Sequence, residues 1–326
     1  MRFAVIGAGA IGAYIGARMA RAGAEVTLFA RGPHLKAMQE RGVEVLNDEG
    51  EFMAHPRAVG SLEEIGGCDV LLLGVKAHAL PALAPQLKPL LSEETTVVST
   101  QNGVPWWFFQ GFGGAMDGTH LESVDPGGGI AASIPATSVV GSIVYFSTEV
   151  TRPGVIQHVE GNRISLGEPD GSRSERSRAI SQALIAAGLR CPITTRIRHE
   201  IWVKILGNAS FNPLSALTGA TLVRMCGDRE VRAVVAAMMQ EAERVAAKLG
   251  IELPVSIEQR IAGAEKVGEH KTSMLQDLEA GRPLELEAVA GALLEIGEKM
   301  AIPMPHTRAV YASTKLMAAV RKESRG

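Results

Sequence analysis

A lysine and two asparagines recur every four residues in the segment 201–212. A helix would place Lys204, Asn208 and Asn212 on one face, because positions four apart lie above one another. A solvated helix face is the ordinary explanation of such a pattern. However, glycine, asparagine and serine are poor helix formers for an exposed face, and a buried lysine beside amides can act as a general acid towards a carbonyl oxygen. The spacing leaves both interpretations open.

Two further polar residues stand in the segment 272–285. Ser273 and Gln276 have the spacing of a capping box, so helix capping is the preferred role for Ser273. Glu285 follows a Gly-Arg-Pro break and is expected in the first turn of the next helix. The helix dipole favours a carboxylate there whether or not it binds a ligand. Neither residue indicates chemistry by itself.

A glycine-rich turn lies near the start of the chain, between an apolar strand at 3–6 and an Ala-rich helix at 11–22. In such a unit the first glycine allows the tight turn, the second lets the backbone approach a pyrophosphate and the third permits close packing. The helix N-terminus supplies N–H groups for the phosphates. We therefore expect a dinucleotide to contact Gly7, Ala8, Gly9, Ala10, Ile11 and Gly12.

The residue after the second expected strand, 25–30, bears on the choice of cofactor. Enzymes that use NAD usually place an acidic residue there to bind the ribose 2′-hydroxyl, whereas this sequence has Arg31. A guanidinium can bind a 2′-phosphate in a bidentate manner. A solvated surface arginine is the alternative, but the missing carboxylate favours NADP, bound as NADPH.

Two more candidates follow expected strands at 69–75 and 95–99. Ligands of open α/β sheets bind at the carboxyl ends of the strands, where Lys76 and Asn102 would lie. Lys76 can equally be a solvated lysine at a helix start. An Asn-Gly pair is more often only a turn, although here Asn102 could face the ribose or nicotinamide of a cofactor.

The order of expected elements predicts an α/β fold, with an N-terminal Rossmann-like doubly wound parallel sheet and a second, all-helical C-terminal domain. A crossover helix is expected at 80–91 and antiparallel strands are expected at the sheet edge at 138–147, 154–159 and 163–167. The glycine-rich segment 111–137 is expected to be a surface insertion. Helical patterns follow at 198–218, 228–249, 256–267, 273–280, 285–300 and 306–322. We expect an NADP-binding domain over 1–194 and a substrate and catalytic domain over 195–326.

Composition excludes several classes of function. The net charge of −2 over 326 residues gives no basic field for nucleic acid or an anionic membrane. The sequence has no apolar run of the roughly 18 residues that span a bilayer, and it runs directly into the glycine turn without a signal peptide. The three cysteines, Cys68, Cys191 and Cys226, form no CxxC pair. They predict neither a disulfide framework nor a metal site, and they favour the cytoplasm.

These segments together resemble the 2-dehydropantoate 2-reductase (ketopantoate reductase) family. No single motif carries the resemblance; the order and separation of the motifs do. They are the glycine turn, Arg31, Val75-Lys76-Ala77, Gln101-Asn102-Gly103, Pro153-Gly154-Val155, Trp202-Val203-Lys204 with Asn208 and Asn212-Pro213-Leu214, then Ser273-Met274-Leu275-Gln276-Asp277 and Glu285.

The resemblance implies the NADPH-dependent reduction of 2-dehydropantoate to pantoate, a step of pantothenate biosynthesis. It implies that Lys204 is the general acid and that Glu285 binds and orients the substrate. It also implies that Asn208, Asn212 and Ser273 line the substrate pocket, while Lys76 and Asn102 lie near the cofactor and the reacting centre. A homodimer is a further expectation of the resemblance.

The sequence departs from the family pattern at three places. Leu284 and Ala290 stand where family members commonly have threonine and asparagine, and the segment 105–137 is unlike the compact family form. Its adjacent tryptophans, Trp106 and Trp107, could pack under the insertion or cap the active-site cleft. A paralogue acting on another, bulkier 2-keto acid is therefore an alternative.

Two other functions stay open. A dehydrogenase for a glycerol 3-phosphate-like substrate would need further basic residues, which Arg196, Arg198 or Arg282 could supply. An NADPH-binding sensor without catalysis is an alternative of another class. It would need neither Lys204 nor Glu285, so their presence counts against it.

Overall fold

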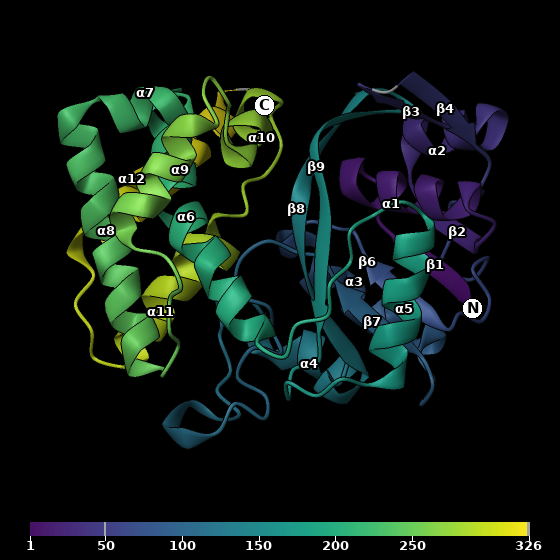
Figure 1. Ribbon diagram of the computed structural model, residues 1–326, viewed down its shortest axis with the longest axis horizontal. Helices are drawn as coiled ribbons and strands as arrows, with labels where there is room; N and C mark the ends of the chain where they lie inside the picture. Colours follow the sequence, from purple (N-terminus) through teal and green to yellow (C-terminus); the bar gives the residue numbers. More distant parts are fainter. Residues whose placement is uncertain (49, 325–326) are drawn as a thin grey trace. The chain divides into compact units, whose positions relative to one another are not determined.

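The first half of the chain builds a mixed sheet around β1 (Arg2–Ile6) in the computed structural model, which describes residues 1–48 and 50–324. The strand order in the sheet is β4-β3-β9-β8-β7-β6-β1-β2-β5. Strands β1, β2, β6 and β7 pair in parallel, as predicted (Figure 1). Strand β8 also pairs in parallel with β7, which corrects the purely antiparallel edge strand predicted at 138–147, and the parallel strand β5 was not predicted. The other bounds are β2 (Glu25–Phe29), β3 (Val43–Asn47), β4 (Gly50–Ala54), β5 (Arg57–Val59), β6 (Val70–Leu73), β7 (Thr96–Ser99), β8 (Val139–Arg152) and β9 (Val155–Gly167).

Both faces of the central strands are buried, which explains why they read as continuous apolar runs. Phe3 and Val5 of β1 belong to one core cluster together with residues of α1 (Ala10–Arg21) and α5 (Glu175–Ala186). The alternate residues Ala4 and Ile6 are fully buried outside that cluster. The remaining helices of this half are α2 (Gly32–Arg41), α3 (Leu80–Leu87) and α4 (Gly129–Ser133), with 3-10 turns at Ala77–Ala79, Lys88–Leu90, Gly114–Met116, Pro126–Gly128 and Ala136–Ser138.

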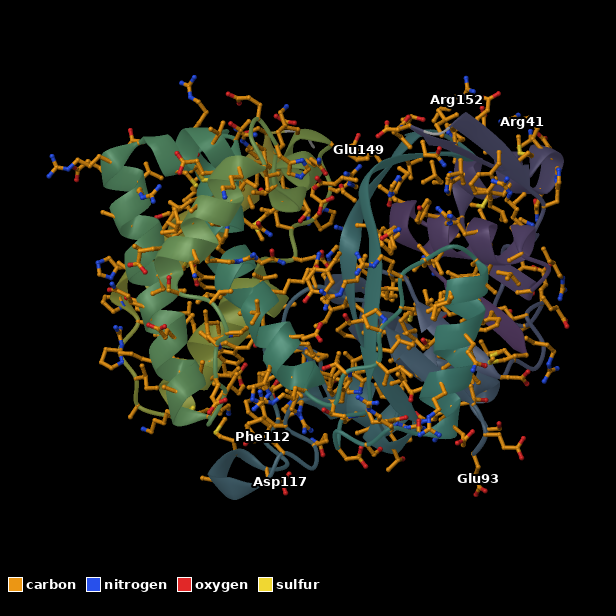
Figure 2. The ribbon with its side chains drawn as sticks, in the orientation of Figure 1. Arg41, Glu93, Phe112, Asp117, Glu149 and Arg152 are labelled. Carbon is orange, nitrogen blue, oxygen red and sulfur yellow. The ribbon has the colours of Figure 1, made fainter. Side chains whose placement is uncertain are left out.

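The strands predicted at 154–159 and 163–167 are one continuous strand, β9, so the predicted break between them is wrong. Gly161 has a φ of 73°, and a Cβ there would lie 2.3 Å from the Tyr145 carbonyl oxygen. The glycine therefore marks an irregularity in the β8–β9 pairing, where the register shifts, and not a turn. The sheet continues beyond this hairpin into β3 and β4, so the predicted edge position is also wrong. An ion pair of 3.1 Å joins Arg152 of β8, labelled in Figure 2, to Glu44 of β3.

The second half is helical, as predicted. Its elements are α6 (Ile197–Thr218), α7 (Leu222–Gly227), α8 (Arg229–Lys248), α9 (Ile257–Lys266), α10 (Ser273–Glu279), a π turn (Glu287–Gly291), α11 (Ala292–Lys299) and α12 (Pro305–Glu323). The sequence does not predict α7, because six residues are too few to show a helical period. No helix among the described residues combines the length and apolar character needed to cross a bilayer.

The chain divides into two compact units. The first comprises residues 1–101, 107–119 and 128–197, and the second comprises 102–106, 120–127 and 198–326. Two short segments from the first half of the sequence thus belong to the helical unit. One of them begins with Asn102, and the other lies within the glycine-rich segment.

The glycine-rich segment 111–137 is not the surface excursion that its composition predicts. Five of its apolar side chains are buried, namely Met116, Leu121, Val124, Ile130 and Ile134. Glycine content predicts irregular backbone, which is what this segment has, but it does not predict exposure. The exposed part is a glycine-containing loop that carries Phe112 and Asp117 (Figure 2), where the Phe112 N–H donates to the Asp117 carboxylate at 2.9 Å.

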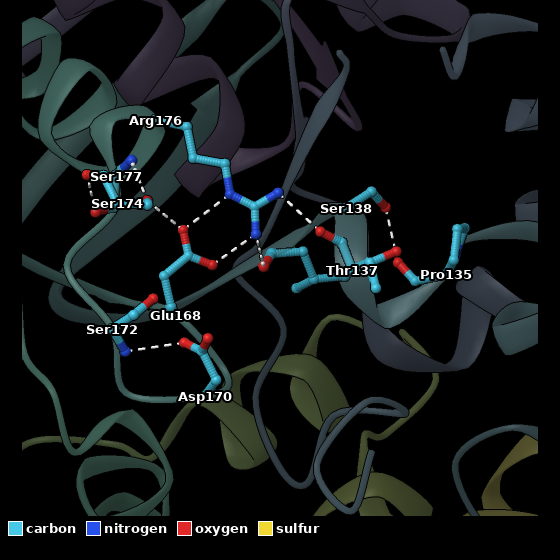
Figure 3. Close-up of polar contacts among 10 residues, drawn as sticks. Pro135, Thr137, Ser138, Glu168, Asp170, Ser172, Ser174, Arg176 and Ser177 are labelled. Carbon is cyan, nitrogen blue, oxygen red and sulfur yellow. Dashed lines mark hydrogen bonds and ion pairs between the residues drawn. The ribbon is translucent and has the colours of Figure 1, made fainter. Parts of the chain in front are cut away.

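A buried carboxylate fixes the point where this segment rejoins the sheet. Glu168 is 3% exposed, and the Arg176 guanidinium donates to both of its oxygens, at 2.8 and 2.6 Å. The same guanidinium donates to the carbonyl oxygens of Thr137, at 2.8 Å, and Val139, at 3.2 Å (Figure 3). The hydrogen bonds that the guanidinium donates to Glu168 raise the pKa of Arg176. This bidentate pair therefore ties the start of β8 to the end of β9.

Candidate active site

The glycine turn of the first unit is shaped by close backbone contacts. Gly7 has a φ of 95°, and a Cβ there would lie 2.5 Å from Val75 Cγ1. At Gly12 a Cβ would lie 2.3 Å from the Gly7 carbonyl oxygen. Gly9 differs, since nothing lies within 4 Å of a Cβ built on it. Two glycines therefore shape the turn, and the third leaves open space in front of it, as a bound pyrophosphate requires.

The same turn supplies donors for an anion. Helix α1 begins at Ala10, and its first-turn N–H groups, on Ala10, Ile11 and Gly12, have no partner within the helix. Its first turn contains no acidic residue. The N–H groups of Gly7 and Ala8 instead donate to the Phe29 carbonyl oxygen, at 3.2 and 2.9 Å. Of the predicted residues, Gly7 and Ala8 therefore bind the turn to β2, whereas the N–H groups of Ala10, Ile11 and Gly12 at the helix start fit a phosphate group.

Arg31 lies two residues beyond the end of β2, the strand whose Phe29 carbonyl oxygen accepts hydrogen bonds from the glycine turn. It is exposed, and it occupies the position before the first residue of α2. Its guanidinium lies 5.4 Å from the centre of the Phe29 ring. An exposed cation beside the glycine turn fits the 2′-phosphate of NADP, because no carboxylate stands at the end of β2 to repel it.

The motif Pro153-Gly154-Val155 has a structural role. Gly154 forms the turn between β8 and β9 with a φ of 82°, and its N–H donates to Nδ1 of His34 at 2.9 Å. Burial lowers the pKa of His34. The neutral imidazole therefore accepts this bond and ties the β8–β9 turn to α2, close behind Arg31.

The carboxyl ends of β6 and β7 are joined by a residue that sequence reasoning missed. Nε2 of Gln101 donates to the carbonyl oxygens of Leu73, at 3.0 Å, and Val75, at 3.3 Å. Lys76 follows directly and stands before the 3-10 turn Ala77–Ala79. The Gln101-Asn102-Gly103 motif drew attention to this position. However, the sequence around a glutamine at a strand end does not show whether its side chain bridges two strands or is solvated.

Helix α6 carries the predicted lysine–asparagine face in the second unit. Lys204 and Asn208 are half-buried, and Asn212 is only 7% exposed. The helix is anchored by Trp202, which is fully buried and donates from Nε1 to the Ala242 carbonyl oxygen of α8 at 3.2 Å. A fully solvated face, the ordinary explanation of the spacing, is therefore wrong for these three residues.

Glu285 is a buried carboxylate, 6% exposed, at the start of the next helical segment. The prediction placed Glu285 in the first turn of this helix, and that is wrong: Glu285 is the residue before the helix. Its carbonyl oxygen accepts the first helical hydrogen bond, from the Val289 N–H at 3.2 Å. Asn102 Nδ2 donates to Glu285 Oε2 at 3.5 Å. The structure thus brings together two predicted site residues that are 183 positions apart. This carboxylate–amide pair can hold a polar substrate group by hydrogen bonds.

Ser273 does not cap α10, so the predicted capping box is wrong. The cap is Thr272, whose side chain accepts from the Leu275 N–H at 3.3 Å, while Ser273 is the exposed first helical residue. Both residues are good caps, and only the backbone geometry shows which one precedes the helix. The Ser273 hydroxyl is therefore not used for capping.

The residues that depart from the family pattern lie in apolar surroundings. Ala290 is fully buried in a cluster with Ala216, Met274, Leu278 and Leu286, and Leu284 packs against the same cluster. Trp107 is also fully buried, with Nε1 donating to Ser99 Oγ at 3.0 Å. It fills the space over Gly141, where a Cβ would lie 2.6 Å from the indole. Trp107 thus packs against β7 and β8.

The fold and these side chains define a class of protein. A Rossmann-like unit with a glycine turn, combined with a helical unit that carries a lysine–asparagine face and a buried glutamate, is the plan of a dinucleotide-dependent oxidoreductase. The described residues contain no group of three or more His, Cys, Asp or Glu side chains placed to hold a metal ion.

Comparisons with known proteins place the chain within this class. The family model described as ketopantoate reductase PanE/ApbA matches residues 3–106, and the model of the C-terminal part of that family matches residues 196–318. A 2-dehydropantoate 2-reductase from Mesorhizobium japonicum is 48% identical over 322 residues, which cover 98% of this chain and 99% of the relative. The chain therefore belongs to the ketopantoate reductase family, as the motifs predict.

Solved structures agree with this assignment. The crystal structure of a putative ketopantoate reductase from Ralstonia solanacearum MolK2 is 39% identical, covers 98% of each chain and superposes with a TM-score of 0.93. A ternary structure of D-mandelate dehydrogenase with NADH and anilino(oxo)acetate superposes with a TM-score of 0.84 over 98% of this chain and 99% of that one, at 21% identity. At that identity the second likeness shows the fold alone.

Proposed function

We propose that this protein is an NADPH-dependent 2-dehydropantoate 2-reductase, an oxidoreductase that acts on a CH–OH group in pantothenate biosynthesis. The observation that carries the proposal is the buried Glu285 carboxylate beside Asn102, in a family member that also keeps Lys204 half-buried on α6. A protein that only bound NADPH would need none of these. The relative that is 48% identical to this chain bears this name, and the similarity covers almost the full length of both proteins.

The first unit, within residues 1–194, holds the cofactor. The N–H groups of Ala10, Ile11 and Gly12 bind the pyrophosphate, Gly9 leaves room for it, and Gly7 and Ala8 fix the turn. Arg31 would hold the 2′-phosphate, and Lys76, at the strand ends, would lie beside the reacting part of the cofactor. When bound, NADPH supplies a hydride, which is added to the ketone carbon of the substrate.

The helical unit, which includes Asn102 and the helices from residue 198 on, holds the substrate. Lys204 donates a proton to the ketone oxygen as the hydride reaches the carbon, so that the C=O group becomes CH–OH. The deprotonated lysine then regains a proton from water. Glu285, oriented by Asn102, accepts a hydrogen bond from the substrate hydroxyl, and Asn208, Asn212 and Ser273 line the remaining pocket.

The positions that depart from the family do not require a different substrate. Ala290 and Leu284 belong to an apolar cluster, so the loss of an asparagine there changes core packing. This supports 2-dehydropantoate over a bulkier 2-keto acid.

The test is a panel of 2-keto acids and dihydroxyacetone phosphate, each with NADPH and with NADH, followed by nicotinamide absorbance. We expect the highest kcat/KM for 2-dehydropantoate with NADPH. A higher value for another 2-keto acid would show a paralogue, and a preference for the phosphate substrate would show the glycerol 3-phosphate alternative. Tight NADPH binding without turnover of any substrate would favour the sensor.

We further propose that the enzyme is a cytoplasmic homodimer. Cys68, Cys191 and Cys226 are all free and buried, which suits a reducing compartment. The dimer is an expectation of the family, and light scattering of the purified protein, which gives its molar mass, tests it.

A further inference from the structure

The helix that follows Glu285 begins with a π turn. In the segment Glu287–Gly291 the chain carries one more residue per turn than an α-helix, and the N–H of Ala292 donates to the Glu287 carbonyl oxygen five residues earlier. Such turns are rare, and they frequently occur at functional sites. Because Glu285 lies only two residues before this turn, whatever holds the turn also determines where Glu285 lies.

One support comes from the segment that carries Asn102. The N–H of Val104 donates to the Ala288 carbonyl oxygen at 2.9 Å. Gly103 has a φ of 89°, and a Cβ there would lie only 2.2 Å from the same oxygen. Only glycine allows this approach. Asn102 thereby reaches Glu285, so that three consecutive residues contact the start of the helix.

A second support comes from α12. The Tyr311 hydroxyl lies 2.9 and 2.7 Å from the two carboxylate oxygens of Glu287, in the π turn. Lys315 Nζ lies 2.8 Å from Glu287 Oε1 and 3.0 Å from the Tyr311 hydroxyl. The carboxylate fills the space beside Gly291, where a Cβ would lie 2.6 Å from Glu287 Oε2.

The two α12 contacts differ in weight. The Lys315 side chain is 60% exposed, and an exposed ion pair contributes little to stability. Tyr311 is half-buried and packs against the cluster that contains Leu286 and Ala290. A hydrogen bond to a charged acceptor in such a place contributes more. Burial raises the pKa of Tyr311, so its hydroxyl keeps its proton at neutral pH.

We propose that Tyr311 and Gly103 are positioning residues, which hold the π turn Glu287–Gly291 from two sides and thereby keep Glu285 beside Asn102. Both residues act through Glu285 and not as substrate ligands. The inference rests on the proposed function, which assigns substrate binding to Glu285.

The experiment compares wild-type enzyme with Tyr311→Phe, which removes only the hydroxyl. We expect the KM for 2-dehydropantoate to rise by roughly threefold to tenfold, the loss expected for one charged hydrogen bond. The kcat and the KM for NADPH should stay within about twofold, because the reacting groups are untouched. Backbone amides of 286–292 should exchange hydrogen faster. Lys315→Gln is the matched control, with little change in KM.

A second variant disturbs the same contact from the other side. The Cβ of Gly291→Ala would displace the Glu287 carboxylate at an ordinary helical φ of −61°. It should also raise the KM for 2-dehydropantoate. The double variant with Tyr311→Phe should show much less than the product of the two effects, because both break one contact. Gly103→Ala should raise the KM further, since backbone atoms must move.

Several results would overturn the inference. They are an unchanged KM for 2-dehydropantoate in Tyr311→Phe despite faster exchange, unchanged exchange, or a parallel loss in kcat and both KM values. A wild-type enzyme that reduces no 2-keto acid would refute the proposed function instead. The exchange comparison needs no substrate, so it would still support or overturn the hold of Tyr311 on the π turn.

Discussion

The glycine turn of the first unit and the Asn102–Glu285 pair of the second unit reach defined geometries by different routes. The turn is contiguous, and backbone contacts within a few ångströms shape it, such as Gly12 against the Gly7 carbonyl oxygen. The pair joins residues 183 positions apart and depends on the π turn, Gly103 and α12. A site built from backbone can be recognised in a short motif, whereas a site assembled from distant side chains cannot.

The largest expected effect on activity concerns the site in the helical unit, which is assembled from residues far apart in the sequence. Lys204→Ala should lower kcat by roughly 10²–10⁴-fold, the usual contribution of a positioned general acid. NADPH affinity should stay nearly unchanged, because the contiguous turn binds the cofactor without Lys204. Steady-state kinetics and fluorescence titration with NADPH measure the two quantities, and Lys266→Ala, at an exposed lysine of α9, is the control. Retained turnover would contradict the role assigned to Lys204.

A substitution of Arg31 tests cofactor binding beside the contiguous glycine turn of the first unit. Arg31→Ala should weaken NADPH binding by roughly tenfold to a hundredfold, the contribution of charge-assisted hydrogen bonds to a 2′-phosphate. NADH binding should not change, because NADH lacks that phosphate. Isothermal titration with both cofactors checks this. Arg41→Ala, at the exposed far end of the same helix (Figure 2), is the matched control. Equal losses for NADPH and NADH would show that Arg31 acts on the fold only.

Two glycines within the turn separate binding from folding. Gly9→Ala places a methyl group in open space, so it should leave the melting temperature unchanged but weaken NADPH binding by about tenfold through contact with the pyrophosphate. Gly12→Ala would crowd the Gly7 carbonyl oxygen and should destabilise the fold by about 1–3 kcal/mol. Calorimetry and titration of both variants check this. A stable Gly9→Ala variant with undiminished NADPH binding would contradict the proposed phosphate site.

The smallest effect concerns another assembled contact of the helical unit. Glu295 of α11 accepts from the N–H groups of Glu122, at 3.0 Å, and Ser123, at 2.9 Å, and from the Ser123 hydroxyl at 2.7 Å. Burial alone would raise the pKa of Glu295, but these bonds and the charge of Lys299 outweigh it, so the pKa lies below its ordinary value of 4.5. This contribution to stability is therefore present above pH 4.5 and lost as the pH falls through the lower folded-state value.

Glu295→Gln should consequently lower the free energy of unfolding by about 1 kcal/mol at pH 7. The difference from wild type should shrink as the pH falls below the ordinary glutamate range. Urea unfolding followed by circular dichroism at several pH values measures it. A difference that does not depend on pH would show that the charge of Glu295 contributes nothing. Glu298→Gln, at an exposed glutamate of the same helix, is the control.

The sequence alone determined the features that local patterns encode. Gly7 and Gly12 define a turn because only glycine fits their backbone contacts, Gly9 leaves open space beside it, and the apolar period distinguishes the sheet from the helices. The four-residue spacing of Lys204, Asn208 and Asn212 placed them on one helix face. The order of these motifs was sufficient for the family, which the comparisons confirm.

Only the tertiary structure decided which distant residues meet. The structure shows that Asn102 contacts Glu285 and that Thr272, not Ser273, caps α10. It also shows that β9 runs without a break through Gly161 and that five apolar residues of the glycine-rich segment are buried. It also placed Ala290 in an apolar cluster, where its departure from the family pattern bears on packing. The physical reason is that such contacts depend on chain topology and packing, whereas periodicity and turn propensity report only on neighbours in sequence.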